Sequence, residues 1–152
     1  MKRYIFLFLF IFCISLSPFA EEDAVLRIGG SVSPKSLSRG QEGKIILKLT
    51  VQEGLTVNPQ PSFSIEFSPC VAIIFSKEAF TDADLDIEIL EEMGEEYLNL
   101  KDPVEIPFTV SPDAEKGKHL LEGKIKYFVC SKEEGWCLKS SSKFSVSVSI
   151  SE

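Results

Sequence analysis

The sequence feature that most constrains the fold is an alternation of apolar and polar residues at every second position. This period recurs between Ile45 and Ile150, whereas the spacing of an amphipathic helix is not sustained anywhere after residue 20. Because side chains alternate across a strand, each alternating segment predicts a half-buried strand. The apolar members of these segments lie at positions 45, 47, 49 and 51; 63, 65 and 67; 85, 87 and 89; 104, 106, 108 and 110; 121, 125, 127 and 129; and 144, 146, 148 and 150.

Segments rich in residues that favour turns separate these predicted strands. They read SPKSLSRGQEG, NPQP, KDP, SPDAEKGK and KEEG. Six or more short strands with such turns between them are typical of two packed antiparallel sheets. We therefore predict an all-β fold, an immunoglobulin-like antiparallel β-sandwich.

The first 20 residues have the layout of a secretory signal peptide. Lys2 and Arg3 precede an apolar run from Tyr4 to about Leu16, and the segment SPFA follows with small residues at Ser17 and Ala20. An uncleaved anchor is the alternative, although the run falls short of the roughly 20 residues that span a bilayer. We expect residues 1–20 to be removed and residues 21–152 to form one domain, periplasmic or otherwise exported.

The charge of the remaining chain bears on its partners. Without Lys2 and Arg3 it has 14 basic and 23 acidic residues, a net charge of −9. This balance disfavours nucleic acid and anionic lipid surfaces as partners. The single histidine, His119, offers no catalytic set with Ser and Asp, and we expect no cofactor.

The acidic segment between residues 78 and 96 raises the question of a calcium site. Its series D-x-D-x-D-x-E begins at Asp82, but the sixth and twelfth positions are Ile87 and Met93 rather than the Gly and Glu of an EF-hand loop. Alternation with apolar residues instead predicts the solvated face of an edge strand, where charge deters pairing with other chains.

Three cysteines remain after the predicted signal peptide: Cys70, Cys130 and Cys137. An odd number means that at least one is unpaired or pairs between chains. Cys70 follows Pro69, which disfavours a central strand, and we expect a buried free thiol there. A zinc site that combines the three cysteines with His119 matches no familiar ligand spacing, so we expect no metal site.

Strand parity predicts where Cys130 and Cys137 point. Each lies on the opposite phase from the apolar residues of its strand, and therefore on the polar face. If residues 131–136 form the hairpin loop, the two cysteines face each other at a Cα separation of about 4.5 to 5.5 Å. That separation permits a disulfide.

Two roles for this pair stay open from the residues alone. A structural disulfide closing so small a ring would stabilise the fold by roughly 2 to 3 kcal/mol in the chain-entropy model. A reactive pair would be expected on the solvent face at the mouth of a loop. Three lysines, Lys126, Lys132 and Lys139, are near enough in sequence to favour a thiolate, although Glu133 and Glu134 oppose them.

The segment Y127-F-V-C130-S-K-E-E-G-W-C137 resembles the redox hairpin of the N-terminal periplasmic domain of the thiol:disulfide interchange protein DsbD. Upstream, PVEIPFTVSPDAEKGKHLLEGKIKY and GKIILKLTVQEGLTVNPQPS are also similar to that family. The resemblance covers roughly residues 32–150, and the Tyr-x-x-Cys to Cys segment is its specific part.

The resemblance implies an immunoglobulin-like fold with Cys130 and Cys137 as a catalytic redox pair. Its partners would be a membrane-embedded thiol-disulfide electron donor and exported thiol proteins that accept the electrons. Tyr127 and Trp136 would shield the pair. The alternative is a non-catalytic immunoglobulin-like binding or scaffold module with a structural hairpin disulfide.

Overall fold

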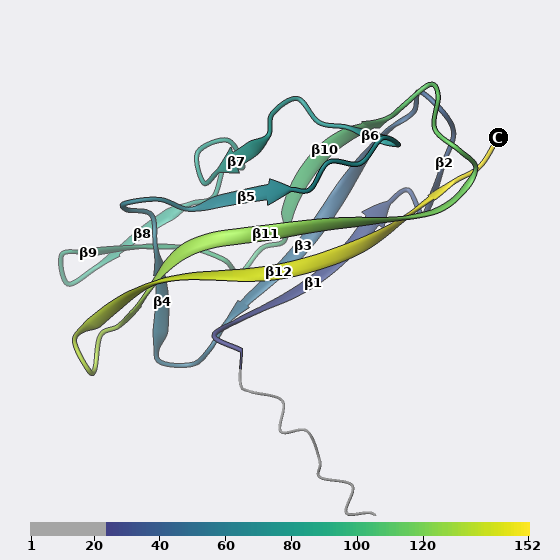
Figure 1. Ribbon diagram of the computed structural model, residues 1–152. Coiled ribbons are helices and arrows are strands. Elements are labelled where there is room, and N and C mark those ends of the chain that lie inside the picture. The colour runs from purple at the N-terminus through teal and green to yellow at the C-terminus, as the bar shows by residue number, and fades with distance from the viewer. Residues whose placement is uncertain (1–23) are drawn as a thin grey trace, which may run out of the picture.

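A computed structural model describes residues 24–152, and two antiparallel sheets pack against each other in it (Figure 1). The first sheet has the order β1-β3-β10-β6. Its strands are β1 (Leu26–Ser33), β3 (Glu42–Val51), β10 (Val104–Val110) and β6 (Ile73–Ile74). No residue in this range is helical, so none of the described chain has the long apolar helix that would cross a bilayer.

The second sheet has the order β2-β12-β11-β5-β7, and β4 also pairs with β11. Its strands are β2 (Ser36–Leu37), β12 (Trp136–Ile150), β11 (Gly117–Ser131), β5 (Ser64–Phe67), β7 (Ala79–Thr81) and β4 (Leu55–Asn58). A separate two-stranded hairpin is formed by β8 (Ile89–Glu92) and β9 (Glu95–Leu98). All strand pairs are antiparallel except β12 with β2.

The order of the principal strands confirms the predicted fold class. Sheet one follows the A-B-E-D order of an immunoglobulin sandwich when β1, β3, β10 and β6 take those places. In sheet two, β5, β11 and β12 follow the C-F-G order. The protein is therefore an all-β, immunoglobulin-like sandwich.

The core lies between the two sheets and is made by the predicted apolar phases. Inward residues of β3, β10, β11 and the second half of β12 are mostly buried, and their outward neighbours are exposed or half-buried except at the end of β11. Gly30 allows the edges of the two sheets to meet, because a Cβ there would collide with the side chain of Val146. The central members of this core are Ile45, Leu47, Ile106, Val110, Leu121, Ile125, Val129 and Val148.

The strand predicted around residues 85–89 is wrong in its first half. Residues 82–86 form a turn, and β8 begins only at Ile89. Thr81 and Asp84 explain the turn, because each accepts a hydrogen bond on its side chain from the backbone N–H of the other. Lys77 also bonds Asp84, and these contacts, Lys77 first, lower the pKa of Asp84 to about 2. Local polar side chains thus override the alternation.

Candidate functional site

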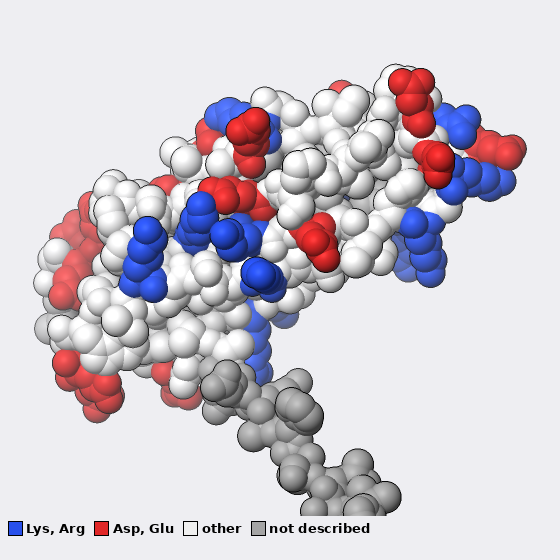
Figure 2. All heavy atoms as spheres, viewed as in Figure 1, with Lys and Arg blue, Asp and Glu red and all other residues white. Residues whose placement is uncertain are grey.

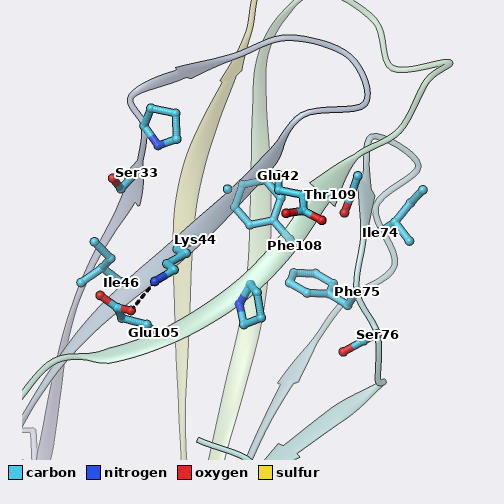
Figure 3. Close-up of a pocket in the computed structure, with 13 residues that line it drawn as sticks. Ser33, Glu42, Lys44, Ile46, Ile74, Phe75, Ser76, Glu105, Phe108 and Thr109 are labelled. Atoms are coloured by element: carbon cyan, nitrogen blue, oxygen red, sulfur yellow. Dashed lines mark hydrogen bonds and ion pairs between the residues drawn. The ribbon is translucent and has the colours of Figure 1, made fainter.

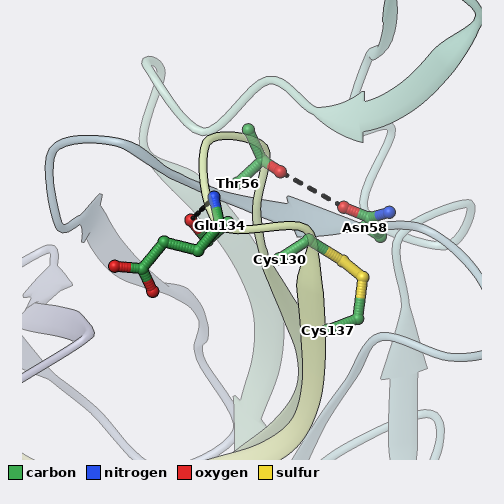
Figure 4. Close-up of a disulfide and its surroundings, with 6 residues drawn as sticks. Thr56, Asn58, Cys130, Glu134 and Cys137 are labelled. Carbon is green, nitrogen blue, oxygen red and sulfur yellow. Dashed lines mark hydrogen bonds between the residues drawn. A yellow bond between two sulfur atoms is a disulfide. The ribbon is translucent and has the colours of Figure 1, made fainter.

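The β11–β12 hairpin brings Cys130 and Cys137 together at its end. The two residues are directly opposite in the strand register and form a disulfide, with a Cα separation of 4.1 Å (Figure 4). The next pair, Ser131 and Trp136, closes the ladder. The predicted cross-strand pairing is therefore confirmed, but the turn comprises residues 132–135 rather than 131–136, and the Cα separation is shorter than the predicted 4.5 to 5.5 Å.

The loop is held by short-range hydrogen bonds to Ser131. The backbone N–H of Gly135 donates to the carbonyl oxygen of Ser131 at 2.9 Å, and the N–H of Glu134 donates to its Oγ at 3.1 Å. Gly135 has a φ of 74°, a conformation that glycine adopts without strain. The indole N–H of Trp136 donates to Glu134. These contacts fix the geometry of the chain that joins the two cysteines.

The two sulfur-bearing residues differ sharply in exposure. Cys130 is only 7% exposed, whereas Cys137 is exposed. Cys130 lies on the inner strand β11, between Cys137 of β12 and Thr56 of β4 (Figure 4). Cys137 lies on β12, whose other edge has no described partner strand at this end. The expectation that both cysteines lie on an open polar face is therefore wrong for Cys130.

The unpredicted strand β4 is the reason for this burial. Its residues Leu55 to Asn58 pair with Phe128 to Ser131, so its outward side chains Thr56 and Asn58 stand beside Cys130. The sequence signal was weak but present, because LTVN alternates directly after the turn at Gly54. A four-residue strand of this kind is easily assigned to a loop.

A hollow of about 480 Å³ lies over the disulfide. One side is formed by the two cysteines with Trp136, and residues 58–60 contribute a second side. The β8–β9 hairpin forms the third, through Glu91, Gly94, Glu95 and Glu96. The disulfide therefore faces a hollow that is bordered in part by the β8–β9 hairpin.

Lys132 connects that hairpin to the turn at residues 132–135. Its Nζ lies 2.8 Å from Glu92 Oε2 and 4.8 Å from the centre of the Tyr97 ring. The hydrogen bond from Lys132 lowers the pKa of Glu92, and the same bond raises the pKa of Lys132. The contact joins two segments 40 residues apart in the chain.

The lysines expected to favour a thiolate are mostly engaged elsewhere. Lys132 bonds Glu92, and Lys126 Nζ lies 2.9 Å from Glu66 Oε1. Lys139 is opposite Phe128 in the register and lies two residues from Cys137 along β12. The surroundings of the disulfide therefore combine cationic and acidic groups rather than forming a purely basic pocket.

The two aromatic residues expected to shield the pair occupy different places. Trp136 is half-buried and borders the hollow beside Cys137. Tyr127 is 3% exposed and belongs to the core, with its hydroxyl 2.9 Å from Ser142 Oγ. Because Tyr127 and Cys130 differ in strand parity, Tyr127 faces away from the disulfide, which does not fit a shielding role.

The remaining candidate residues lie apart from this site. Cys70 is a free thiol as expected, but it is half-buried rather than buried, and it packs against the core. His119 Nε2 lies 2.6 Å from the carbonyl oxygen of Glu115. Among residues 24–152, no three His, Cys, Asp or Glu side chains are grouped as metal ligands would be.

A larger hollow of about 750 Å³ lies on the outer face of the first sheet (Figure 3). Phe75, Phe108 and Ile74 line it together with the ion pair between Lys44 Nζ and Glu105 Oε2, at 2.8 Å. Its lining includes no cysteine or histidine, so it does not extend the disulfide site.

Comparison with known proteins gives likenesses of fold. No family model and no curated protein matches this sequence. The N-terminal periplasmic domain of ScsB from Proteus mirabilis is 13% identical with a TM-score of 0.42, covering 79% of this chain and 44% of that one. A cohesin module from Clostridium perfringens is 14% identical with a TM-score of 0.39, covering 83% and 96%.

Murine CRIg gives a third likeness, at 7% identity and a TM-score of 0.35, covering 84% of this chain and 98% of that one. The present chain thus spans less than half of the ScsB structure and nearly all of the cohesin and CRIg structures. At these TM-scores the likenesses carry no information on activity.

Proposed function

We propose that this protein is an exported thiol-disulfide exchange domain. In this proposal it passes reducing equivalents from a membrane-embedded thiol-disulfide donor to exported thiol proteins through Cys130 and Cys137. The observation that carries the proposal is the unequal exposure of the bridged pair, with Cys137 open at the edge of a sheet and Cys130 buried behind it. Exchange needs one accessible sulfur and one held in place to complete the reaction.

The reaction follows from that arrangement. A thiolate of the donor attacks Cys137 Sγ, the Cys130–Cys137 bond breaks, and Cys130 leaves as a thiolate. A second donor thiolate then attacks its partner sulfur in the mixed disulfide, which releases oxidised donor and leaves both cysteines of this domain reduced. The reduced domain next attacks the disulfide of an acceptor through Cys137.

Cys130 completes the second half of the cycle. Its thiolate attacks Cys137 Sγ of the mixed disulfide and displaces the acceptor thiolate, so the acceptor leaves as a dithiol after taking up protons. Two electrons and two protons move from donor to acceptor, and no cofactor is required. The strand register keeps Cys130 directly opposite Cys137 throughout.

The experiment compares the two single-cysteine variants in a Cys70→Ser background. Cys130→Ser leaves the exposed Cys137, and Cys137→Ser leaves the buried Cys130. With oxidised glutathione, the first variant should form a mixed disulfide on the order of tenfold faster, because exposure governs access to a thiolate. Equal, slow reaction of both variants would contradict the proposal.

A non-catalytic module with a structural disulfide is the second candidate. The observation in its favour is the burial of Cys130 beside Thr56, since buried cysteines are typically inert. In that case Cys137 has no catalytic use, and a difference in rate between the two variants reflects only their exposure. The reduction potential of the Cys130–Cys137 pair separates the two candidates.

A further inference from the structure

The outer face of the second sheet carries an unusual concentration of positive charge. By strand parity, β5, β11 and β12 present five lysines and two glutamates on this face. The whole chain has a net charge of −7, so this face has the opposite sign. We name Lys124, Lys126, Lys139 and Lys143 the lysine strip; Figure 2 shows lysines gathered over β11 and β12.

The strip includes a pair of like charges that the fold itself does not need. Lys124 and Lys143 are directly opposite in the β11–β12 register. Their Cβ atoms are therefore separated by roughly 5 Å, and like charges at such positions destabilise a sheet. Within residues 24–152, neither lysine has an ion pair at 4.0 Å or less, nor does Lys139; Lys126 pairs with Glu66. Glu66 of β5 is opposite Lys124 on its other side, but its carboxylate bonds Lys126. The repulsion between Lys124 and Lys143 is therefore only partly offset within the fold, and an external anionic group would relieve it further.

The lysine strip extends along β12 to the exposed Cys137, and the outer edge of β12 beside it is unpaired with any described strand over most of its length. Lys139 lies two residues beyond Cys137 on the same face of β12. Strand β2 pairs with β12 only at Ser149 and Ile150, so no described strand covers the rest of that edge. On the other side of the disulfide, the β8–β9 hairpin presents Glu91, Glu92, Glu95 and Glu96, all exposed. The charge around the disulfide is therefore polarised, with a positive side and a negative side.

We propose that the lysine strip is a docking surface for thiol protein partners that carry acidic residues beside their reactive cysteine. This inference rests on the proposed function and adds the partner's chemistry and orientation. The acidic side of the partner would lie over β11 and β12, and repulsion from the acidic hairpin would exclude the reverse orientation. Charge of this kind raises association rates more than final affinity. A membrane surface fits less well, because the acidic hairpin beside the strip would repel anionic lipid.

The test measures the rate at which short peptide thiols reduce the Cys130–Cys137 disulfide at low salt. Two ten-residue probes each carry one cysteine, flanked by Asp and Glu in one and by Lys in the other. The strip variant carries Lys124→Gln, Lys139→Gln and Lys143→Gln. Its matched control carries Lys35→Gln, Lys48→Gln and Lys101→Gln, exposed lysines outside the outer face of the second sheet, with the same change in net charge.

We compare the ratio of the acidic-peptide rate to the basic-peptide rate among the three proteins. This ratio should be several-fold lower in the strip variant than in the wild type, and it should be nearly the same in the control variant as in the wild type. The wild-type ratio should also shrink as salt rises from 0.01 to 0.15 M, because the screening length drops from about 30 to about 8 Å. An equal fall in both variants, or no fall in either, overturns the docking surface.

Two further arms keep this outcome separate from the proposed function. Reduction by neutral 2-mercaptoethanol should be equal in wild-type and strip variants; if no thiol reduces the disulfide at all, the exchange function itself fails. A Cys130→Ser/Cys137→Ser variant titrated with the serine form of the acidic peptide should show NMR shifts along the strip, independent of any redox step. Binding to phosphatidylglycerol vesicles without such peptide shifts would overturn the proposal in favour of a membrane surface.

Discussion

The two ends of the β11–β12 hairpin differ in how deeply their inward-facing side chains are buried. Near the chain's C-terminus, Leu121 and its cross-strand partner Val146 are 0% and 4% exposed, because the first sheet covers both strands. At the hairpin tip, Val129 is 1% exposed while its partner Leu138 is 56% exposed. The same split separates Cys130 from Cys137 on the opposite face. At the tip, Val129 and Cys130 on the inner strand β11 are buried and their partners on the edge strand β12 are exposed, whichever face of the sheet they occupy.

This difference indicates how one hairpin serves both stability and access. The covered end anchors both strands in the core and fixes the register that places Cys130 opposite Cys137. The tip then places one member of each pair on an inner strand and the other on an edge. The site inherits a rigid geometry without being closed to solvent.

The largest expected effect on stability contrasts two leucines on the inward face of the hairpin, Leu121 of β11 and Leu138 of β12. Leu121→Ala should lower the free energy of unfolding by about 2 to 5 kcal/mol, since it leaves a cavity in the core. Leu138→Ala should cost well under about 1 kcal/mol, because the side chain is already exposed. Urea unfolding measures both. Similar losses from the two substitutions would mean that the tip is part of the packed core.

The next effect comes from removing the disulfide. Cys130→Ser with Cys137→Ser should lower the free energy of unfolding by about 2 to 3 kcal/mol or less, because the ring it closes is short. Cooperative unfolding should persist, as the covered end of the hairpin is unchanged. Loss of a cooperative transition would show that the tip depends on the bridge and that its role is structural.

A smaller effect is expected at the contact between Lys132 and Glu92. Lys132→Ala should speed amide hydrogen exchange in β8 and β9 while leaving β3 and β10 unchanged, since only the hairpin loses a contact. Exposed pairs of this kind affect local order more than global stability. Lys101→Ala, on an exposed lysine outside this contact, is the control, and faster exchange in that variant would assign the effect to lost charge alone.

The pH dependence of the same contact follows from the lowered pKa of Glu92. A carboxylate with a depressed pKa in the folded state stabilises above its unfolded value, 4.5 here, and that contribution disappears as the pH falls through the folded value. The exchange difference between wild type and Lys132→Ala should therefore be present near pH 6 and vanish in acid.

The smallest expected effect is a gain in stability at the lysine strip. Lys143→Gln should raise the free energy of unfolding by a few tenths of a kcal/mol, because it removes one member of a like-charged cross-strand pair. Thermal unfolding at low salt checks the sign, and the gain should shrink in high salt. A clear loss of stability would show that Lys143 has a structural contact of its own.

Much of the fold could be predicted from the sequence where strands are long and half-buried. Alternation located β3, β10, β11 and β12 and assigned their inward faces. Each of these strands has one face on the core and one toward solvent, so its apolar residues recur at every second position. It failed for residues 82–86, where Thr81 and Asp84 bond each other's backbone and form a turn. It also missed β1 and several strands of two to four residues, since short segments give too few alternations to recognise.

The candidate site was predicted in its pairing but only partly in its environment. Local spacing was enough to place Cys130 opposite Cys137 at a loop mouth. Burial of Cys130 depends on β4, and the hollow depends on the β8–β9 hairpin, 30 or more residues away. Contacts at such separations leave no periodic trace near the cysteines, so sequence reasoning from parity alone overestimated the exposure of Cys130.

The reduction potential of the Cys130–Cys137 pair tests the central claim most directly. It can be measured by equilibrating residues 21–152 with glutathione or dithiothreitol buffers and counting free thiols by alkylation, in the Cys70→Ser background. Structural disulfides of exported proteins usually lie below about −300 mV, and exchange-active ones lie higher. If the protein is an exchange domain, the reduction potential should lie above about −300 mV. A potential well below that value would contradict the proposed function and favour a non-catalytic module with a structural disulfide.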